Sequence, residues 1–196
     1  MQHWFTLPHD GGSSLACSCA TDRIVEVFGH LEADTVISVP VDEPGLDPGQ
    51  IVRALEAAGA GEPDQATTFF CEFFAEQDYV SVCSAKVVLD ARGQLLYMSR
   101  AIIPVRKDGS HDATLLKKNV GVFVFPRRFL ERLAAQAAVP TQLDRLEGLE
   151  QLRWLELGLH VRCLEIRHIG FGVDLPEHLS LLAERLQCAS PPTRSA

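Results

Sequence analysis

The chain has 196 residues, of which 46% are hydrophobic and 22% are charged, and its formal net charge at pH 7 is −8. This size and composition are typical of one globular domain with its own core. The acidic balance, without any stripe of lysine and arginine, argues against non-specific nucleic-acid binding. No apolar run approaches the ~20 residues of a membrane span, and the N-terminus does not resemble a secretion signal. We therefore expect a cytoplasmic protein without a membrane or nucleic-acid partner.

The six cysteines form no C-x-x-C pair of the kind that binds zinc. In a cytosolic protein we expect most of them to be reduced core thiols. A metal or redox role for Cys17 and Cys19 remains the alternative.

The first half of the chain predicts a strand, a helix and a hairpin. Residues 35–41 are an apolar, β-branched run typical of a buried strand. Asp47 and Pro48 then give a helix N-cap and a first helical position, and Gly59 or Gly61 is the natural stop. Two apolar stretches, 86–90 and 94–98, surround a turn in which Gly93 supplies a positive φ.

The second half predicts two further strands and three helices. Residues 119–125 and 160–166 are the strands. The helices are expected at 126–138, at 143–157 and, with Asp174 as N-cap, at 174–186. Alternating strands and helices with one inserted hairpin favour an α/β fold with a mixed, mostly parallel sheet flanked by helices. We expect one domain over residues 1–189 and a disordered tail at 190–196.

Several segments, in order along the chain, resemble those of 3-deoxy-manno-octulosonate cytidylyltransferase, the CMP-Kdo synthetase family. The segment 36–44 reads V-I-S-V-P-V-D-E-P, and the family has V-x-V-Q-G-D-E-P. The segments 86–90 and 96–104 read K-V-V-L-D and L-Y-M-S-R-A-I-I-P, close to the family's K-V-V-L-D and L-Y-F-S-R-A-x-I-P. Further matches lie at 19–24 (C-A-T-D-R-I), 119–123 (N-V-G-V-F), 149–153 (L-E-Q-L-R) and 172–177 (G-V-D-L-P-E).

The resemblance implies a nucleotide-diphospho-sugar-transferase-like (Rossmann-like) fold and a homodimer, with the region 85–118 as a dimerisation and sugar-acid sub-domain. In the family, a sugar-acid hydroxyl attacks the α-phosphate of CTP and pyrophosphate leaves. The family's first βα unit, with its R-x-x-S-x-R-L-P-G-K loop, and the strand–helix unit that follows it have no counterpart here, so this chain looks like a truncated member. The loss would leave a sheet edge exposed, to be covered by the N-terminal segment, a second copy or a partner protein.

On the sugar-acid side, the resemblance implies five substrate-binding residues. Arg100 matches the arginine that pairs with the substrate, and a guanidinium is well shaped to bind a carboxylate. Glu150 and Gln151 match residues that hydrogen-bond sugar hydroxyls, and Lys86 matches a family lysine. Asn119 stands where the family has a histidine.

On the nucleotide side, the resemblance implies a metal pair and a remnant of the base site. Asp42 and Asp174 match carboxylates that would bind Mg²⁺ and, with the arginine at position 100, carry the catalysis. Thr21, Asp22 and Arg23 remain from the segment that receives the nucleotide.

Departures from the family pattern concentrate on the nucleotide side. Pro40 and Val41 replace the glutamine and glycine before the first aspartate, and Cys19 and Ala20 replace a serine and a glycine. Proline removes a backbone donor, and valine fills space that glycine leaves open. No other stretch resembles a phosphate-binding loop. We therefore do not expect CTP to bind.

These features favour an enzyme that has lost CTP-dependent cytidylyl transfer and acts on an acidic, hydroxylated small molecule, with specialised metabolism as one setting. The first alternative is a non-catalytic binding or assembly subunit. The second alternative is a cytidylyltransferase that is still active.

Overall fold

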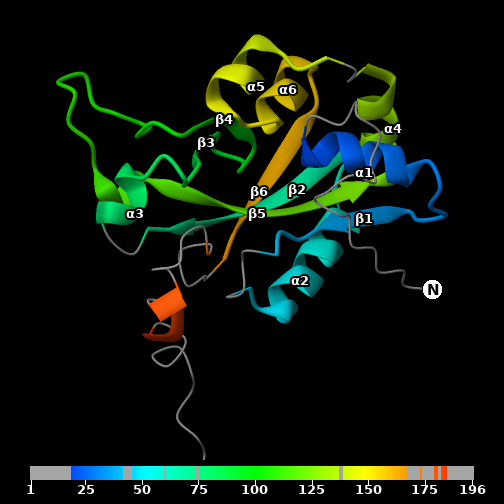
Figure 1. Cartoon of the computed structure of the whole chain (residues 1–196), viewed down its shortest axis with the longest axis horizontal. Helices are drawn as coiled ribbons and strands as arrows, with labels where there is room; N and C mark the ends of the chain where they lie inside the picture. Colours follow the sequence, from blue (N-terminus) through cyan, green and yellow to red (C-terminus); the bar gives the residue numbers. More distant parts are fainter. Residues whose placement is uncertain are drawn as a thin grey trace, which may run out of the picture.

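The computed structural model describes residues 19–41, 46–59, 61–73, 76–136 and 139–166, with residue 173 and the short stretches 179–180 and 182–184 (Figure 1). The helices are α1 (Ala20–Phe28), α2 (Pro48–Gly59), α3 (Glu76–Val80), α4 (Arg127–Gln136), α5 (Gln142–Glu147) and α6 (Gln151–Glu156), with a 3-10 turn η1 (Ala113–Leu115). The strands are β1 (Thr35–Ser38), β2 (Gln65–Glu72), β3 (Lys86–Leu89), β4 (Leu95–Ser99), β5 (Lys117–Pro126) and β6 (His160–Glu165). The predicted helix at 174–186 and the predicted tail at 190–196 lie almost wholly outside the described residues.

Local sequence signals account for several of these elements. Helix α2 begins at Pro48, and the Asp47 carboxylate accepts a hydrogen bond from the Gly49 amide at 2.9 Å, as expected of an N-cap region. The β3–β4 hairpin is confirmed, with Gly93 in its turn at φ 79°. The strand predicted at 35–41 is shorter, because β1 ends at Ser38, before Pro40.

One predicted helix is wrong. Residues 143–157 form two short helices, α5 and α6, because Gly148 takes a left-handed conformation at φ 60° and closes α5. That conformation is open to glycine and ends a helix. Leu146 is accordingly exposed, whereas Leu149 and Leu152 are buried.

The six strands form one mixed sheet in the order β4-β3-β5-β2-β6, and β1 also pairs with β5. Strand β5 is antiparallel to β1, β2 and β3, and β2 with β6 is the one parallel pair among the strands that the structure describes. The α/β class is therefore confirmed, but the expected predominance of parallel pairing is wrong. Among the described strands, β1 pairs with β5 alone. The edge of β1 that faces away from β5 therefore has no strand partner among the described residues.

Two hydrophobic clusters cover the two faces of the sheet. On one face, Phe123 and Phe125 of β5 pack against Trp154 of α6 and Phe129 of α4. On the other face, the intervening β5 residues, such as Val124, pack with α2. Figure 1 shows α2 on one side of the sheet and α1, α4, α5 and α6 on the other. Among the described helices, none is long and apolar enough to cross a membrane.

The β3–β4 hairpin departs from the plane of the sheet. Its base pairs with β5 through Lys86 and Lys118, but its turn contacts β6, where the Cys163 amide donates to the Gly93 carbonyl at 2.8 Å. Since β2 lies between β5 and β6, the hairpin arches over β2. A space is left beneath the arch, and its lining is described below.

Candidate functional site

Arg100 directly follows β4, and its guanidinium is oriented by backbone carbonyl groups. Its Nε donates to the Glu147 carbonyl at 2.8 Å, and its Nη2 donates to the Gly148 carbonyl at 3.3 Å. Its Nη1 donates to the Val82 carbonyl at 2.7 Å. The guanidinium therefore joins the α5–α6 turn to the loop that precedes β3, without pairing with a carboxylate among these contacts.

Lys86 is fully buried at the start of β3. Its Nζ donates to three carbonyl groups, those of Ser81 at 2.7 Å, Ser84 at 2.8 Å and Arg100 at 2.8 Å. Burial, followed by the neighbouring charge of Arg100, lowers the pKa of Lys86. With all three donors used, this lysine supports the position of Arg100 rather than presenting a free amine.

Together, Lys86 and Arg100 bind four consecutive carbonyls of residues 81–84. Lys86 donates to the carbonyls of Ser81 and Ser84, and Arg100 Nη1 donates to those of Val82 and Cys83. Among the described residues, the carboxylate that bonds close by is that of Glu147, which accepts from the Ser99 hydroxyl at 2.7 Å and from the Arg100 amide at 2.9 Å. Two cations therefore face one carboxylate at this end of the site.

Asn119 lies on β5, next to the same hairpin base. Its side-chain amide donates to the Phe69 carbonyl at 3.0 Å and to the Thr68 hydroxyl at 3.1 Å. Its backbone amide donates to the Ala85 carbonyl at 2.9 Å, one residue before Lys86. Asn119 thus joins β2, β3 and β5 near the Arg100 end.

Glu150 and Gln151 lie at the start of α6, just beyond the turn that holds Arg100. Glu150 accepts a hydrogen bond from the Thr21 amide at 3.3 Å, in the first turn of α1. Cys19, the N-cap residue of α1, accepts no hydrogen bond from the backbone amides of the first helical turn. Glu150 therefore provides the acceptor that an N-cap side chain would otherwise supply. Gln151 is buried, with 8% of its surface exposed.

Arg153, which the sequence reasoning did not select, completes the link between α6 and α1. Its guanidinium is 1% exposed and donates from Nη2 to Asp22 at 2.9 Å and to the Cys19 sulfur at 3.1 Å. Its Nε lies 3.7 Å from the Asp144 carboxylate. The L-E-Q-L-R motif contains this arginine, three residues after Glu150, and so offered a signal for it.

Carboxylates dominate this second end. The guanidinium of Arg153 lies close to two of them, Asp22 and Asp144, and a third, Glu150, accepts from the neighbouring Thr21 amide. Burial raises the pKa of Asp144, against the effect of the arginine. Burial, and next the charge of Glu150, raises the pKa of the Cys19 thiol to about 12. The thiol is therefore protonated at neutral pH and is not a reactive nucleophile.

The structure brings most of the predicted residues together. Hydrogen bonds lead from Asn119 through the hairpin base to Arg100, then through the α5–α6 turn toward Glu150 and Thr21. Arg23 is half-buried, one residue further along α1 than Asp22. Asp42 and Asp174 lie outside the described residues, so their predicted metal site stays a prediction. The described residues alone contain no group of three His, Cys, Asp or Glu side chains arranged to bind a metal.

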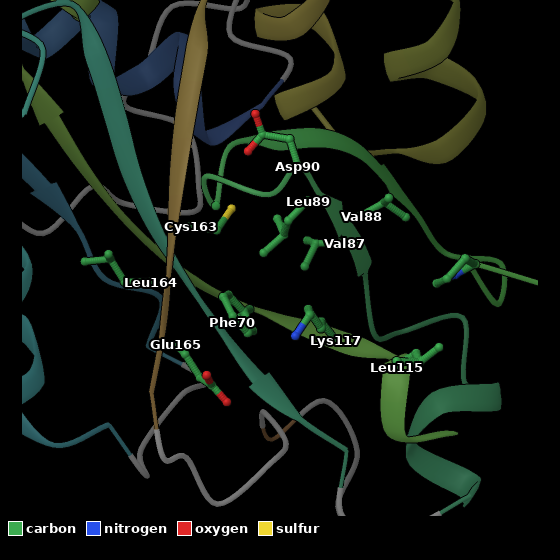
Figure 2. A pocket seen from close by; sticks show the side chains of 12 residues that line it. Phe70, Val87, Val88, Leu89, Asp90, Leu115, Lys117, Cys163, Leu164 and Glu165 are labelled. Atoms are coloured by element: carbon green, nitrogen blue, oxygen red, sulfur yellow. The ribbon is translucent and has the colours of Figure 1, made fainter. Parts of the chain in front are cut away.

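A cavity of about 500 Å³ lies beneath the arch of the hairpin (Figure 2). Its lining comes from the hairpin, β2, β5 and β6, with Pro104 of the loop after β4 and Leu115 of η1, and includes none of the predicted site residues. No sequence pattern indicated this cavity, because it depends on a hairpin whose base pairs with β5 and whose turn contacts β6.

Comparisons with known proteins agree on the family. The model of a family described as cytidylyltransferase matches residues 14–164. The 3-deoxy-manno-octulosonate cytidylyltransferase of Geobacter metallireducens is 35% identical over 175 residues, which cover 85% of this chain and 68% of the relative. The protein of the same name from Trichlorobacter lovleyi is 34% identical over 190 residues, covering 90% and 75% of the two chains.

Solved structures give the same result. The structure of CMP:2-keto-3-deoxy-manno-octonic acid synthetase complexed with CTP matches with a TM-score of 0.72 and 28% identity, over 88% of this chain and 69% of the other. The 4-diphosphocytidyl-2C-methyl-D-erythritol synthase of Anaerococcus prevotii shares the fold, with a TM-score of 0.52 and 10% identity. This chain therefore belongs to the 3-deoxy-manno-octulosonate cytidylyltransferase (CMP-Kdo synthetase) family of cytidylyltransferases.

Proposed function

We propose that the protein acts on an acidic, hydroxylated small molecule of the sugar-acid class, which it binds through Arg100, in a reaction that does not require CTP. The observation that carries this proposal is the charge balance of the two ends of the site. Lys86 and Arg100 lie near one carboxylate, that of Glu147, whereas Arg153 contacts two, Asp22 and Asp144, and Glu150 binds the first turn of the same helix α1. An anion is attracted to the first end, and a triphosphate is repelled from the second.

The contacts of Arg100 suggest how the substrate would bind. Nε and Nη2 stay with the Glu147 and Gly148 carbonyls and fix the plane of the guanidinium. Nη1, which bonds to the exposed loop, would exchange the neutral carbonyls of Val82 and Cys83 for the substrate carboxylate. A charged acceptor forms the stronger hydrogen bond, so the exchange is favourable. Glu150 and Gln151, on the adjoining helix, are the proposed partners of the substrate hydroxyls.

Calorimetry with 3-deoxy-manno-octulosonate tests the proposal. We expect binding without nucleotide, and a loss of roughly 10- to 100-fold in affinity for Arg100→Ala, with a smaller loss for Arg100→Lys because lysine keeps the charge but not the planar fork. The matched control is Arg92→Ala, which removes an exposed arginine from the hairpin turn. The labelling rate of the exposed Cys83 thiol should also change on binding, since its carbonyl leaves Arg100. Wild-type affinity in Arg100→Ala would refute the assignment.

Cytidylyl transfer from CTP to the sugar acid is the second candidate, favoured by the identity to cytidylyltransferases and by the match to a CTP complex. In that case Mg²⁺ held by Asp42 and Asp174 would neutralise the phosphate charge, as the family resemblance implies. A pyrophosphate-release assay with CTP, Mg²⁺ and the sugar acid separates the candidates. Sustained release that is lost in Asp42→Asn would establish the second candidate and overturn the first.

A further inference from the structure

The cavity beneath the β3–β4 hairpin is separate from the site at Arg100. Its floor is Phe70 of β2, and its walls come from β3 and the following turn, from Lys117 of β5, from the end of β6, and from Pro104 and Leu115. Phe70 lies beside Glu165 in the sheet register, and the two strands that flank β2 carry the charged lining residues Lys117 and Glu165. At about 500 Å³, the volume falls in the range of small-molecule sites.

Most of the cavity wall is apolar. Val87, Leu89 and Phe70 point toward its middle in Figure 2, with Cys163 beside them. Burial raises the pKa of the Cys163 thiol to about 12, so this side chain is a neutral part of the wall. A molecule with many hydroxyl groups would leave most of them without hydrogen-bond partners here, which is costly. The sugar acid proposed for Arg100 is therefore a poor fit to this cavity.

The carboxylates of the lining do not serve the interior. The Asp90 carboxylate accepts hydrogen bonds from the Arg92 and Gln94 amides, both at 2.8 Å, and so is engaged in its own turn. Figure 2 shows the carboxylates of Asp90 and Glu165 at opposite ends of the cavity, directed away from its middle.

Lys117 is the one cation among the lining residues, and its amine is directed inward. Its Nζ lies 4.5 Å from the centre of the Phe70 ring, a cation–π contact that places the charge over the aromatic floor. The view in Figure 2 agrees, with the amine turned toward Phe70. An open, largely apolar pocket with one inward ammonium group among its lining residues is chemically suited to a ligand with an apolar body and one negative charge.

We propose that this cavity binds a small apolar carboxylate, an aromatic or branched aliphatic acid whose body packs on Phe70, Val87 and Leu89 and whose carboxylate pairs with Lys117. The polar recognition here rests on one charge, so discrimination between the acid and its neutral amide should be strong, whereas discrimination between apolar bodies of similar size should be weak. The inference is independent of the function proposed for Arg100.

Calorimetry with phenylacetate, its neutral analogue phenylacetamide and the polyhydroxylated acid gluconate tests the proposal. We expect phenylacetate to bind at least about tenfold more tightly than either of the others. Lys117→Met removes the charge and keeps an apolar stem, and should reduce the affinity for phenylacetate to that for the amide. Lys107→Met, at an exposed position in the loop after β4, is the matched control and should bind like the wild type.

Two further comparisons complete the test. Leu89→Trp, which fills the cavity, should abolish binding of both phenylacetate and phenylacetamide, whereas Arg100→Lys should leave phenylacetate binding unchanged and weaken only the sugar acid. The proposal is overturned if phenylacetate fails to bind at about 10 mM, if acid and amide bind equally, or if Lys117→Met binds like the control. The ligand series on the wild-type protein decides the question even if a variant does not fold.

Discussion

Lys86 and Arg100, at one end of the site, donate hydrogen bonds to backbone carbonyls, whereas Arg153, at the other end, lies among side-chain carboxylates. Both arrangements satisfy the donors of a buried or half-buried cation. They differ in what remains for a ligand. Carbonyl dipoles orient a cation without cancelling its charge, but carboxylates neutralise it. The first end is consequently prepared for an anion, and the second serves to join α1 to α5 and α6.

The difference also concerns stability. A cation held by carbonyls can be removed and leave neutral acceptors, some of which can turn to solvent. A cation held by carboxylates leaves like charges close together in a poorly hydrated place when it is removed. Substitutions at the two ends should therefore differ in size and in their dependence on pH.

The largest effect is expected for Arg153→Met. Methionine fills a similar space but leaves Asp22 and Asp144 without the guanidinium that lies between them. Breaking a buried ion pair in this way costs about 3–5 kcal/mol, which urea unfolding followed by circular dichroism would measure. The loss should shrink as the pH falls below about 5, because burial raises the pKa of Asp144 and this carboxylate then takes up a proton and no longer repels its neighbours. A stability equal to that of the wild type would show that the carboxylates are well hydrated.

Arg153 also illustrates what the sequence could not show. Its contacts with Cys19 and Asp22 join residues 134 and 131 positions apart, and no periodicity within α1 or α6 reports such a pairing. Arg100 and Glu150 were found because motifs around them resemble a family, whereas the cavity, which rests on the path of a hairpin, was not.

The fold shows the same division. Helix α2 and the β3–β4 hairpin follow from caps and turns within a few residues. Strand β2 was missed because it is buried on both faces and interrupted by a register shift between Thr68 and Phe69, so it lacks the alternation of a half-buried strand. The long helix predicted at 143–157 had the right leucine spacing, but the conformation of Gly148 decided the outcome.

A smaller effect is expected for Lys86→Met, the counterpart of the first substitution at the carbonyl end. Three carbonyls lose a donor, but no charge is left unpaired, and the loop 81–84 can turn part of them to water. We expect a loss of about 2 kcal/mol, measured by the same urea unfolding, with little change between pH 5 and 8. Cys83 should be labelled faster, since its loop is no longer held by the lysine. A loss as large as that of Arg153→Met would mean that the two ends are held in the same way.

The smallest effect is expected at alkaline pH for Cys19→Ser. Burial and the carboxylate of Glu150 raise the pKa of this thiol to about 12 from its ordinary 9.0, so the folded chain keeps a proton that the unfolded chain loses. The positive charge of Arg153 does not reverse this, because the guanidinium is shared with Asp22 and Asp144. The stabilisation from the protonated thiol is complete below pH 9 and is lost as the pH rises toward 12.

Serine does not titrate in this range, so the free energy of unfolding of the variant should fall less steeply than that of the wild type between about pH 9 and 11. Urea unfolding under reducing conditions at several pH values would measure both slopes. Other groups also have shifted pKa values: burial raises those of Cys163 and Tyr97 and lowers that of Lys86. Their contribution to the pH dependence of unfolding is the same in both proteins and cancels when the two slopes are compared. Parallel slopes would show that the carboxylate end does not hold the Cys19 proton, and the contrast between the two ends would then rest on Arg153 alone.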